Sequence, residues 1–472
     1  SLKSATVTPL LKKPSLDVEN FKNYRPVSNL PYIGKLIEKV AVKQMESYMS
    51  DFDLHEPFQS AYRANHSTET ALVRVANDVL RAADRRECVM LTLLDLSAAF
   101  DTIDHVKFID RLETGFGITG RARKWLESYF RDRSQSVNID GVHSDALPLI
   151  SAFPQGSVVG PFGFKPFTKP LTSIARKHGV NIHLYADDTQ LYVSCKPEEV
   201  DENRQRLESC IDEIRSWMAG NNLKLNDSKT EFMTIGSQHT LTLVGKQEIK
   251  IGDEFIQASQ SARNIGVIFD SKMDMTDHVN QVIKSCYHHM RSISRIRRYL
   301  TQDAAEKLVH AFVTSRLDCN NSLLFGLPDC LLKKLQLIQN NAVRIIAKKR
   351  KCEHITEALM SLHWLPIIFR IEYKVLLLVF KCLEKDEKAG QPPVYLADLL
   401  EPYVPTRTLR SRDNDDLKIP STKLARYGDR AFSVCGPKLW NNLPRDLRRP
   451  MSLDTFKKNL KTHLFRRAYH CS

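Results

Sequence analysis

The chain has 472 residues, of which 42% are hydrophobic and 26% are charged, with 69 Lys and Arg against 55 Asp and Glu. This balance is typical of globular domains and excludes a long disordered or fibrous chain, and the length predicts about three structural units. The net charge of +14 favours a polyanionic partner, nucleic acid before a membrane surface, over an acidic one. A basic soluble protein without such a partner is the alternative.

Membrane and secretory segments are not indicated. The strongest apolar run, residues 375–380, is far shorter than the ~18 residues that a membrane span needs, and no charged-then-apolar leader is present. The ten cysteines form no CxxC pair, so we expect reduced thiols in an intracellular protein. Cys286 with His288 and His289 resembles half a zinc site, but it lacks a second cysteine pair at ligand spacing. The chain opens on Ser1 in what reads as mid-domain sequence, so we expect a fragment of a longer product.

The first region predicts one strand and two amphipathic helices. The strand is predicted over residues 5–11. Apolar residues at helical spacing predict the two buried faces, and Ser67 is suited to cap the second helix. The first face is formed by Ile33, Leu36, Ile37, Val40 and Ala41, and the second by Ala71, Leu72, Val75, Val79 and Leu80.

The middle region predicts a sheet that carries acidic residues. The apolar run 88–94 is short enough for a buried strand, and it ends on Asp95. An amphipathic stretch over 108–130 and a strand-turn-strand region over 136–149 follow. Strands over 182–185 and 189–193 then predict a hairpin with Asp187 and Asp188 at its tip.

The remaining sequence predicts a long helix over 198–218, a strand pair within 232–251, and almost wholly helical structure after Asp270. Pro- and Arg-rich connections occupy residues 391–420. The fold class is therefore α+β, with the helices concentrated toward the carboxyl end.

Three aspartates are the strongest chemical signal. Asp95 ends one strand, and Asp187 with Asp188 lies at a hairpin tip 92 residues after it. Two adjacent strands that present these acids would form an oxygen-rich pocket of the kind that Mg²⁺ prefers. Two such ions can stabilise both the attacking and the leaving oxygen of a phosphoryl transfer. A solvated hairpin tip is the plain alternative.

The surrounding residues resemble a known enzyme family. The segments 185–188 (YADD), 94–101 (LDLSAAFD) and 154–161 (PQGSVVGP) resemble three reverse transcriptase motifs in the family's order. Further similar segments are 23–28, 59–63, 228–231 and 264–267. The segments 363–366, 428–432 and 438–441 resemble the region after the polymerase in jockey-like and chicken-repeat-like non-LTR (LINE) retrotransposons.

The resemblance implies a right-hand polymerase with a mostly helical C-terminal extension. The implied divisions are partial fingers over 1–86, a palm with a small antiparallel sheet over 87–270, a thumb-like helical region over 271–350, and the extension over 351–472. The implied enzyme is an RNA-directed DNA polymerase that extends a DNA 3′-OH from dNTPs on an RNA template. It implies Mg²⁺, with Mn²⁺ as a substitute, no membrane partner, and a nuclear or cytoplasmic ribonucleoprotein. An upstream endonuclease is expected in the full element.

The resemblance also implies roles for single residues. Asp95 and Asp187 would be the main metal ligands, with Asp188 supporting them. Arginines and a lysine would face the triphosphate, since Arg offers a bidentate fork to phosphate oxygens, and Lys229 could donate a proton to the leaving pyrophosphate. Phe100 would exclude a ribose 2′-OH or would otherwise be a core aromatic. The implied nucleotide-binding residues are Leu96, Ser97, Phe100, Gln155, Gly156, Arg63, Arg25 and Lys229.

Two basic clusters in predicted helices are candidates for duplex binding through phosphate contacts, which carry no sequence readout. The first is Arg291, Arg295 and Arg298, and the second is Arg344, Lys348, Lys349, Arg350 and Lys351. The alternative for each is a solvated charged face.

Two rival functions remain open at this point. One is a group II intron-type maturase, which would carry a different carboxyl-terminal extension. The other is a decayed relic that only binds nucleic acid. The relic hypothesis arises from residues 162–170, where the family expects an apolar helix but this chain has Gly163, Lys165, Pro166 and Lys169. We expect Pro166 to break that helix, Gly163 to weaken it, and the lysines to reach solvent or lose their charge.

Overall fold

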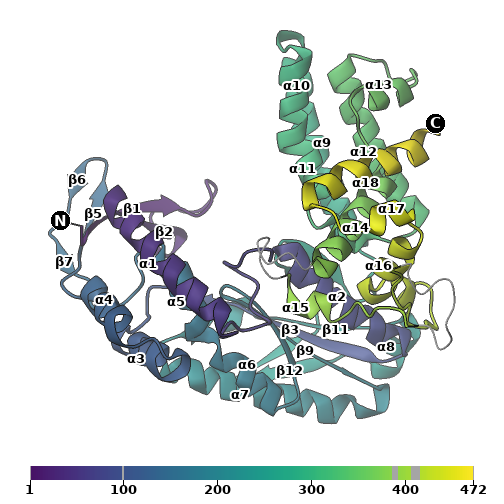
Figure 1. The fold of residues 1–472 in the computed structure, drawn as a ribbon. Helices are drawn as coiled ribbons and strands as arrows, with labels where there is room; N and C mark the ends of the chain where they lie inside the picture. The colour runs from purple at the N-terminus through teal and green to yellow at the C-terminus, as the bar shows by residue number, and fades with distance from the viewer. Residues whose placement is uncertain (1, 98–99, 385–391, 405–414, 471–472) are drawn as a thin grey trace.

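The fold mixes helices and antiparallel sheet, as the sequence predicts (Figure 1). A computed structural model describes residues 2–97, 100–384, 392–404 and 415–470. The central sheet has the order β11-β3-β9-β8, and each of its pairings is antiparallel. Its strands are β3 (Cys88–Leu94), β8 (Asn181–Tyr185), β9 (Asp188–Cys195) and β11 (Glu231–Ile235).

A second sheet lies near the N-terminus, with β1 antiparallel to β2 and parallel to β5. Its strands are β1 (Ser4–Leu11), β2 (Tyr24–Asn29), β5 (Ser134–Ile139), β6 (Val142–His143) and β7 (Leu147–Pro148). Three further pairings are β4 (Leu96–Ser97) with β10 (Lys224–Leu225), β12 (Glu248–Ile251) with β13 (Glu254–Gln257), and β14 (Ser261–Asn264) with β15 (Val267–Asp270).

Two groups of helices lie on either side of the central sheet, and a third set surrounds the sheet itself (Figure 1). The N-terminal sheet and its neighbouring helices lie on one side, and the later helices rise on the other (Figure 1). The helices near the N-terminal sheet are α1 (Tyr32–Asp51), α3 (His105–Phe116), α4 (Gly120–Phe130) and α5 (Val159–Thr168). The helices around the central sheet are α2 (Thr68–Asp84), α6 (Pro170–Lys177), α7 (Val200–Gly220) and α8 (Gln238–Val244). The later helices are α9 (Thr276–Ile296), α10 (Gln302–Val309), α11 (Ser315–Asp318), α12 (Asp329–Ala347), α13 (Thr356–Ser361), α14 (Ile367–Leu383), α15 (Val394–Ala397), α16 (Phe432–Asn441), α17 (Arg445–Arg448) and α18 (Leu453–Tyr469). None of the helices within the described residues is long and apolar enough to cross a membrane.

The predicted second helix is confirmed, and its apolar face is buried. Ser67 caps it, because the Ser67 hydroxyl accepts from the amide of Thr70 while the Thr70 hydroxyl accepts from the amide of Ser67. The strands predicted over 5–11, 88–94, 182–185 and 189–193 are confirmed as β1, β3, β8 and β9. The strand pair predicted within 232–251 is wrong, because α8 separates β11 from β12 and each pairs with another strand.

The buried face predicted for the first helix is wrong. Ile33 and Val40 are each 61% exposed, and Leu36 and Ile37 lie on the same exposed side. Helix α1 instead buries a second stripe at helical spacing: Glu38, Val42, Met45 and Met49. The apolar pattern does not reveal this stripe, since a glutamate stands at its start. The Glu38 carboxylate is satisfied inside the fold, because it accepts from the amides of Val158 and Val159 and from the hydroxyl of Tyr129.

Helix α5 overturns the expectation for residues 162–170. It runs through Pro166, and the one-residue interruption comes at Lys169, before Pro170 starts α6. Lys165 is buried and paired with Glu46, and the Nζ of Lys169 donates to the carbonyl of Leu54 at 2.9 Å. Buried charges of this kind are tolerated when they are paired and hydrogen-bonded.

The glycine at position 163 is explained by close packing. A Cβ at this position would lie 2.6 Å from Cζ of Phe153 and 2.8 Å from Cζ of Phe108, closer than side chains approach each other. The missing side chain therefore lets α5 pack tightly against two aromatic rings.

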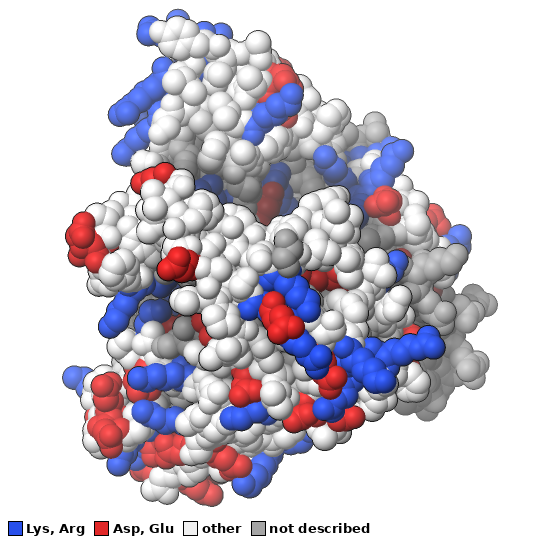
Figure 2. All heavy atoms as spheres, turned by 90° about the vertical axis from the view of Figure 1, so that its left-hand side faces the viewer, with Lys and Arg blue, Asp and Glu red and all other residues white. Residues whose placement is uncertain are grey.

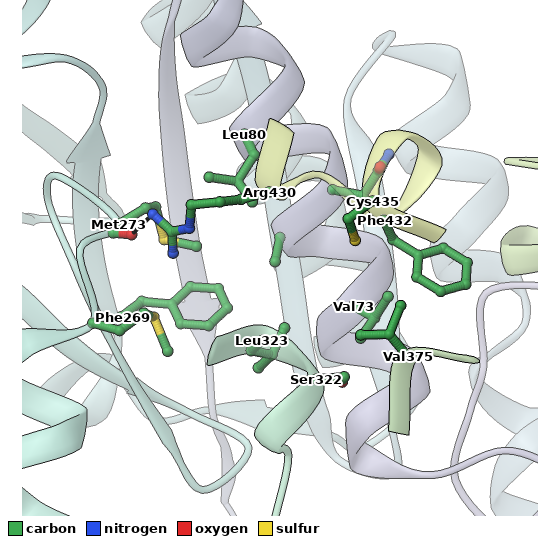
Figure 3. Close-up of a pocket in the computed structure, with 13 residues that line it drawn as sticks. Val73, Leu80, Phe269, Met273, Ser322, Leu323, Val375, Arg430, Phe432 and Cys435 are labelled. Atoms are coloured by element: carbon green, nitrogen blue, oxygen red, sulfur yellow. Dashed lines mark hydrogen bonds between the residues drawn. The ribbon is translucent and has the colours of Figure 1, made fainter. Parts of the chain in front are cut away.

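The C-terminal region packs directly on α2 and on the β14–β15 hairpin (Figure 3). Arg430 is buried at this junction, and its Nη1 donates to the carbonyl of Met273 at 2.7 Å. The Asp84 carboxylate, also buried, accepts from the amides of Lys423 and Leu424. Buried polar contacts across such a junction make the two parts of the chain depend on each other for burial.

We predict that Gly163→Ala destabilises the protein by about 1–3 kcal/mol, because the added methyl overpacks the two phenylalanine rings. Gly115→Ala is the matched control, since Gly115 is an exposed glycine in α3 with nothing within 4 Å of an added Cβ. The control should be neutral or stabilising by up to about 1 kcal/mol. Denaturant unfolding of both variants measures this, and equal stability of the two would contradict the packing argument.

Candidate active site

The register of the central sheet brings the three predicted acids together. Leu94 of β3 is paired with Thr189 of β9, so Asp95, which follows β3, lies beside the start of β9 at Asp188. Tyr185 and Asp188 are themselves paired, which leaves Ala186 and Asp187 as a two-residue turn between β8 and β9. The proximity is also electrostatic, since the Asp95 charge raises the pKa of both Asp187 and Asp188.

The turn that carries Asp187 has an unusual backbone. Ala186 has a φ of +56°, a region that favours glycine, and its side chain is buried. Its amide donates to Oε1 of Gln59 at 3.1 Å, and the same oxygen accepts from the amide of Ala61 at 3.0 Å. The side chain of Gln59, which lies outside the turn, therefore holds it in a conformation that alanine seldom adopts.

Asp95 is held on its other side by residues near β10. Its Oδ2 lies 3.1 Å from Nζ of Lys229 and 3.3 Å from Nδ2 of Asn226, and its carbonyl accepts from the amide of Asn226 at 2.9 Å. The β4–β10 pairing positions this segment opposite Leu96. Lys229 thus pairs with a carboxylate, and its side chain is 66% exposed.

Asp187 and Asp188 carry raised pKa values. Burial is the first cause for Asp187, and the charges of Arg25 and Lys229 oppose it. Burial together with Asp187 and Asp95 raises the pKa of Asp188 to about 6. Crowded carboxylates with too few positive partners are typical of sites that bind cations.

The donor set fits a divalent cation that takes the rest of its ligands from a substrate. Carboxylate oxygens are hard ligands of the type that Mg²⁺ prefers. Across residues 2–97, 100–384, 392–404 and 415–470, no group of three or more His, Cys, Asp or Glu side chains is arranged to hold an ion unaided. This geometry is compatible with Mg²⁺, which is commonly bound by one or two carboxylates plus substrate phosphates and waters. Cys286, in the zinc alternative, is buried and points its Sγ at the carbonyl of Val313.

Gln155 and Gly156 lie in a loop fixed to β2. The carbonyl of Gln155 accepts from the amide of Ser28, and its Nε2 donates to Asp101 at 2.9 Å. Gly156 has a φ of +111°, and a Cβ there would lie 3.0 Å from the carbonyl oxygen of Ser28. The loop therefore requires glycine, and its exposed backbone is open to a ligand.

The other nucleotide-binding candidates differ in their burial and in their contacts. Leu96 is buried, and the backbones of Leu96 and Ser97 pair with Leu225 and Lys224 of β10. Phe100 is half-buried and stacks on Phe164 with ring centroids 4.6 Å apart, which agrees with a packing role. The motif residues 98–99 lie outside the described residues.

The two arginines differ. Arg25 is exposed on β2, and its positive charge partly offsets the rise that burial causes in the pKa of Asp187. Arg63 is half-buried, and its Nη1 donates to the carbonyls of Glu56 and Gln59, so it supports the loop beside the turn. The Arg63 guanidinium is thus occupied by backbone carbonyls, whereas Arg25 is exposed near Asp187.

The two basic clusters meet at neighbouring helix ends. Arg291 and Arg295 are exposed on α9, and the side chain of Arg298 lies over the ring of Tyr299. Lys348 and Arg350 are exposed just after α12, whereas Lys349 donates to the carbonyl of His354. On the face drawn in Figure 2, Lys and Arg line an edge of the upper part of the molecule, and both signs mix below.

Sequence reasoning missed the residue that joins these ends. Arg297, the residue after α9, donates from Nε and Nη2 to the carbonyls of Ile345 and Ile346, both at 2.7 Å, and so caps the C-terminus of α12. It also missed Gln59, Asn226 and Glu38 as supports of the acids and of α5. Gln59 and Asn226 left a signal, since Gln59 lies in the segment 59–63 and Asn226 lies three residues before Lys229, whereas Glu38 left none.

Comparisons with known proteins identify the family of this chain. The family described as "Reverse transcriptase (RNA-dependent DNA polymerase)" matches residues 11–269, and the chain belongs to that family. Among curated proteins, the chain is 26% identical over 288 residues to the RNA-directed DNA polymerase from mobile element jockey of Drosophila melanogaster, covering 59% of this chain and 30% of that protein. It is 24% identical over 347 residues to the probable RNA-directed DNA polymerase from transposon BS of the same species, covering 71% and 37%. The chain thus spans about a third of the length of these relatives.

Solved structures give weaker likenesses. Apo telomerase from Candida tropicalis has a TM-score of 0.41 at 9% identity, covering 79% of this chain and 65% of that one. An RNA-dependent RNA polymerase of a human picobirnavirus, with an insertion loop deleted, has a TM-score of 0.36 at 15% identity, covering 79% and 64%.

We predict that Asp188→Asn stabilises the metal-free protein by about 1 kcal/mol at pH 7–8, a value reduced for solvent screening because the residue, although desolvated on one side, is partly exposed to solvent. The pKa of Asp188 is raised from 3.8 to about 6, so ionisation costs the folded state most above pH 6 and nothing below pH ~4. Thermal unfolding in EDTA should show the gain shrinking as pH falls from 7 to 4. Asp253→Asn, in an exposed turn, is the control, and a pH-independent gain would contradict the assignment.

Proposed function

We propose that this chain is the RNA-directed DNA polymerase of a non-LTR retrotransposon, which extends a DNA 3′-OH with dNTPs on an RNA template. The observation that carries the proposal is the meeting of Asp95, Asp187 and Asp188 at one end of β3 and β9, with Arg25 and Lys229 beside them. Membership of the reverse transcriptase family supports it.

In this proposal the regions divide as a right hand. Residues 1–86 are partial fingers, 87–270 the palm, 271–350 a thumb-like region and 351–472 a C-terminal extension. The four-stranded sheet β11-β3-β9-β8 supports the palm assignment. In a longer polypeptide, an upstream endonuclease would supply the 3′-OH, and the product would act within a nuclear or cytoplasmic ribonucleoprotein.

Asp95 and Asp187 would hold Mg²⁺, or Mn²⁺ in its place, with Asp188 supporting them. When bound, the cation neutralises charge that develops on the transferring phosphoryl group. Arg25 would bind the triphosphate, and Lys229, already 3.1 Å from Asp95, would be placed to protonate the leaving pyrophosphate. The exposed backbone at Gly156 would receive the nucleotide, with Gln155 held in place by Asp101. Phe100, a half-buried ring held in place by Phe164, would limit the sugar to deoxyribose.

Primer extension on poly(rA)/oligo(dT) with Mg²⁺ tests the proposal. We predict that Asp95→Asn and Asp187→Asn each abolish extension, because each removes a carboxylate that the cation requires. Binding of the primer-template should stay within about twofold, since its phosphate contacts lie elsewhere. Asp253→Asn should extend at the parental rate.

Two outcomes would contradict this proposal. Near-parental turnover in either acid variant would refute the metal assignment. A parental chain that binds primer-template but extends no faster than Asp187→Asn would establish the decayed relic instead. The compensated packing of Gly163 and Lys165 argues against decay in α5.

We also propose that the basic face of α9 binds the duplex. Arg291→Glu with Arg295→Glu should weaken binding of all sequences alike and reduce the slope of log affinity against log salt by about 1 for each phosphate that is no longer neutralised. Lys458→Glu with Lys461→Glu on α18 changes the net charge equally and is the control. Equal slopes for the two double variants in a salt titration would mean that the basic face of α9 is a solvated surface that does not bind the duplex.

A further inference from the structure

We propose that Tyr395, which lies outside the matched region 11–269, is a positioning residue for the turn that carries Asp187. It would act through a buried polar chain that reaches β8 and the segment 58–61. The consequence for catalysis rests on the proposed function, whereas the consequence for the turn itself does not.

The segment 58–61 behaves as a short extra strand on the open edge of the central sheet. The amide of Ser60 donates to the carbonyl of Leu184 at 2.9 Å, and the amide of Leu184 donates to the carbonyl of Phe58 at 2.8 Å. Gln59 lies between these bonds, and its side chain holds the amide of Ala186. The position of the Asp187 turn therefore depends on where this segment lies.

Tyr395 locks the segment from the C-terminal side. Its hydroxyl lies 2.7 Å from Oγ of Ser60 and 2.9 Å from Oγ1 of Thr70, and Oγ of Ser60 lies 2.8 Å from Nε2 of His183 in β8. These side chains are buried, with Ser60 1% exposed and His183 fully enclosed. The phenol ring is stacked near Phe58 and lies edge-on to His183.

Counting protons fixes the direction of the chain. The Thr70 hydroxyl donates to the carbonyl of Ser67, so it must accept from Tyr395. Tyr395 has a single proton, so Ser60 donates to Tyr395 and Nε2–H of His183 donates to Ser60. Each group makes one donation to the next, an arrangement in which the bonds strengthen one another.

This chain does not touch the reacting groups. It fixes Ser60 between β8 and the C-terminal region, so the neighbouring Gln59 can hold Ala186 at its strained φ of +56°. Without the Tyr395 hydroxyl, the Ser60 hydroxyl would keep a buried proton with no acceptor, whereas Thr70 would keep its two bonds to Ser67. The segment 58–61 would then shift toward other hydrogen-bond partners, and the turn would lose the hydrogen bond between the Gln59 side chain and the amide of Ala186.

The experiment compares Tyr395→Phe, which keeps the ring and removes the hydroxyl, with Tyr427→Phe. Tyr427 is a buried tyrosine in the C-terminal region that packs in a separate core with Val434. Amide hydrogen exchange over residues 184–188 should be at least about tenfold faster in Tyr395→Phe than in the parent and unchanged in Tyr427→Phe. This readout needs no catalysis.

In primer extension, Tyr395→Phe should lower kcat by about tenfold or more with little change in KM for dNTP, and should need more Mg²⁺ for half-maximal rate. Ser60→Ala should give a similar loss, and the double variant should lose no more than either alone, because the residues act as one unit. Ser60→Ala also serves if Tyr395→Phe does not fold.

Parental exchange at 184–188 in a folded Tyr395→Phe or Ser60→Ala protein would overturn the inference. Additive losses of kcat would do so as well, since they would mean independent structural effects. If the parental chain does not extend primers, the proposed function fails, and the exchange comparison alone decides the role of Tyr395.

Discussion

The structure depends on one pairing, the antiparallel register between β3 and β9. Because Leu94 lies opposite Thr189, the acid after one strand meets the acids before the other. Both strands are almost entirely buried on both faces, so a slip by one residue would exchange the side chains of the two faces and break the packing on each side. The same burial that secures the register raises the pKa of Asp187 and Asp188, so packing and chemistry have a common origin.

Much of the sheet and its acids could be predicted from the sequence, because short apolar runs that end on aspartates leave a local pattern. The motif residues by themselves indicate the family. The buried contacts of a helix could not be predicted where a polar side chain occupies a position in its buried stripe. Glu38 starts the buried stripe of α1, and its three donors come from residues about 90 to 120 positions away. The visible apolar stripe at Ile33 and Val40 therefore predicts the wrong face of that helix.

Long-range contacts also decided the roles of single residues. Arg63 lies in a motif that suggests phosphate binding, yet its guanidinium supports the carbonyls of Glu56 and Gln59. Gln59 lies in the same motif and holds the turn at Ala186. No sequence period links Tyr395 to Ser60, since they are brought together only by the docking of α15 on α2 and the loop before it. Roles that depend on such docking are set by the tertiary structure and leave no local pattern.

The fit of α5 has an evolutionary consequence. A larger side chain at Gly163 would collide with Phe108 and Phe153, and an apolar residue at 165 would leave Glu46 without its cation. Single substitutions at 163 or 165 would therefore pass through less stable intermediates. This segment is epistatically coupled to its neighbours, because a change in it calls for matching changes at Phe108, Phe153 or Glu46.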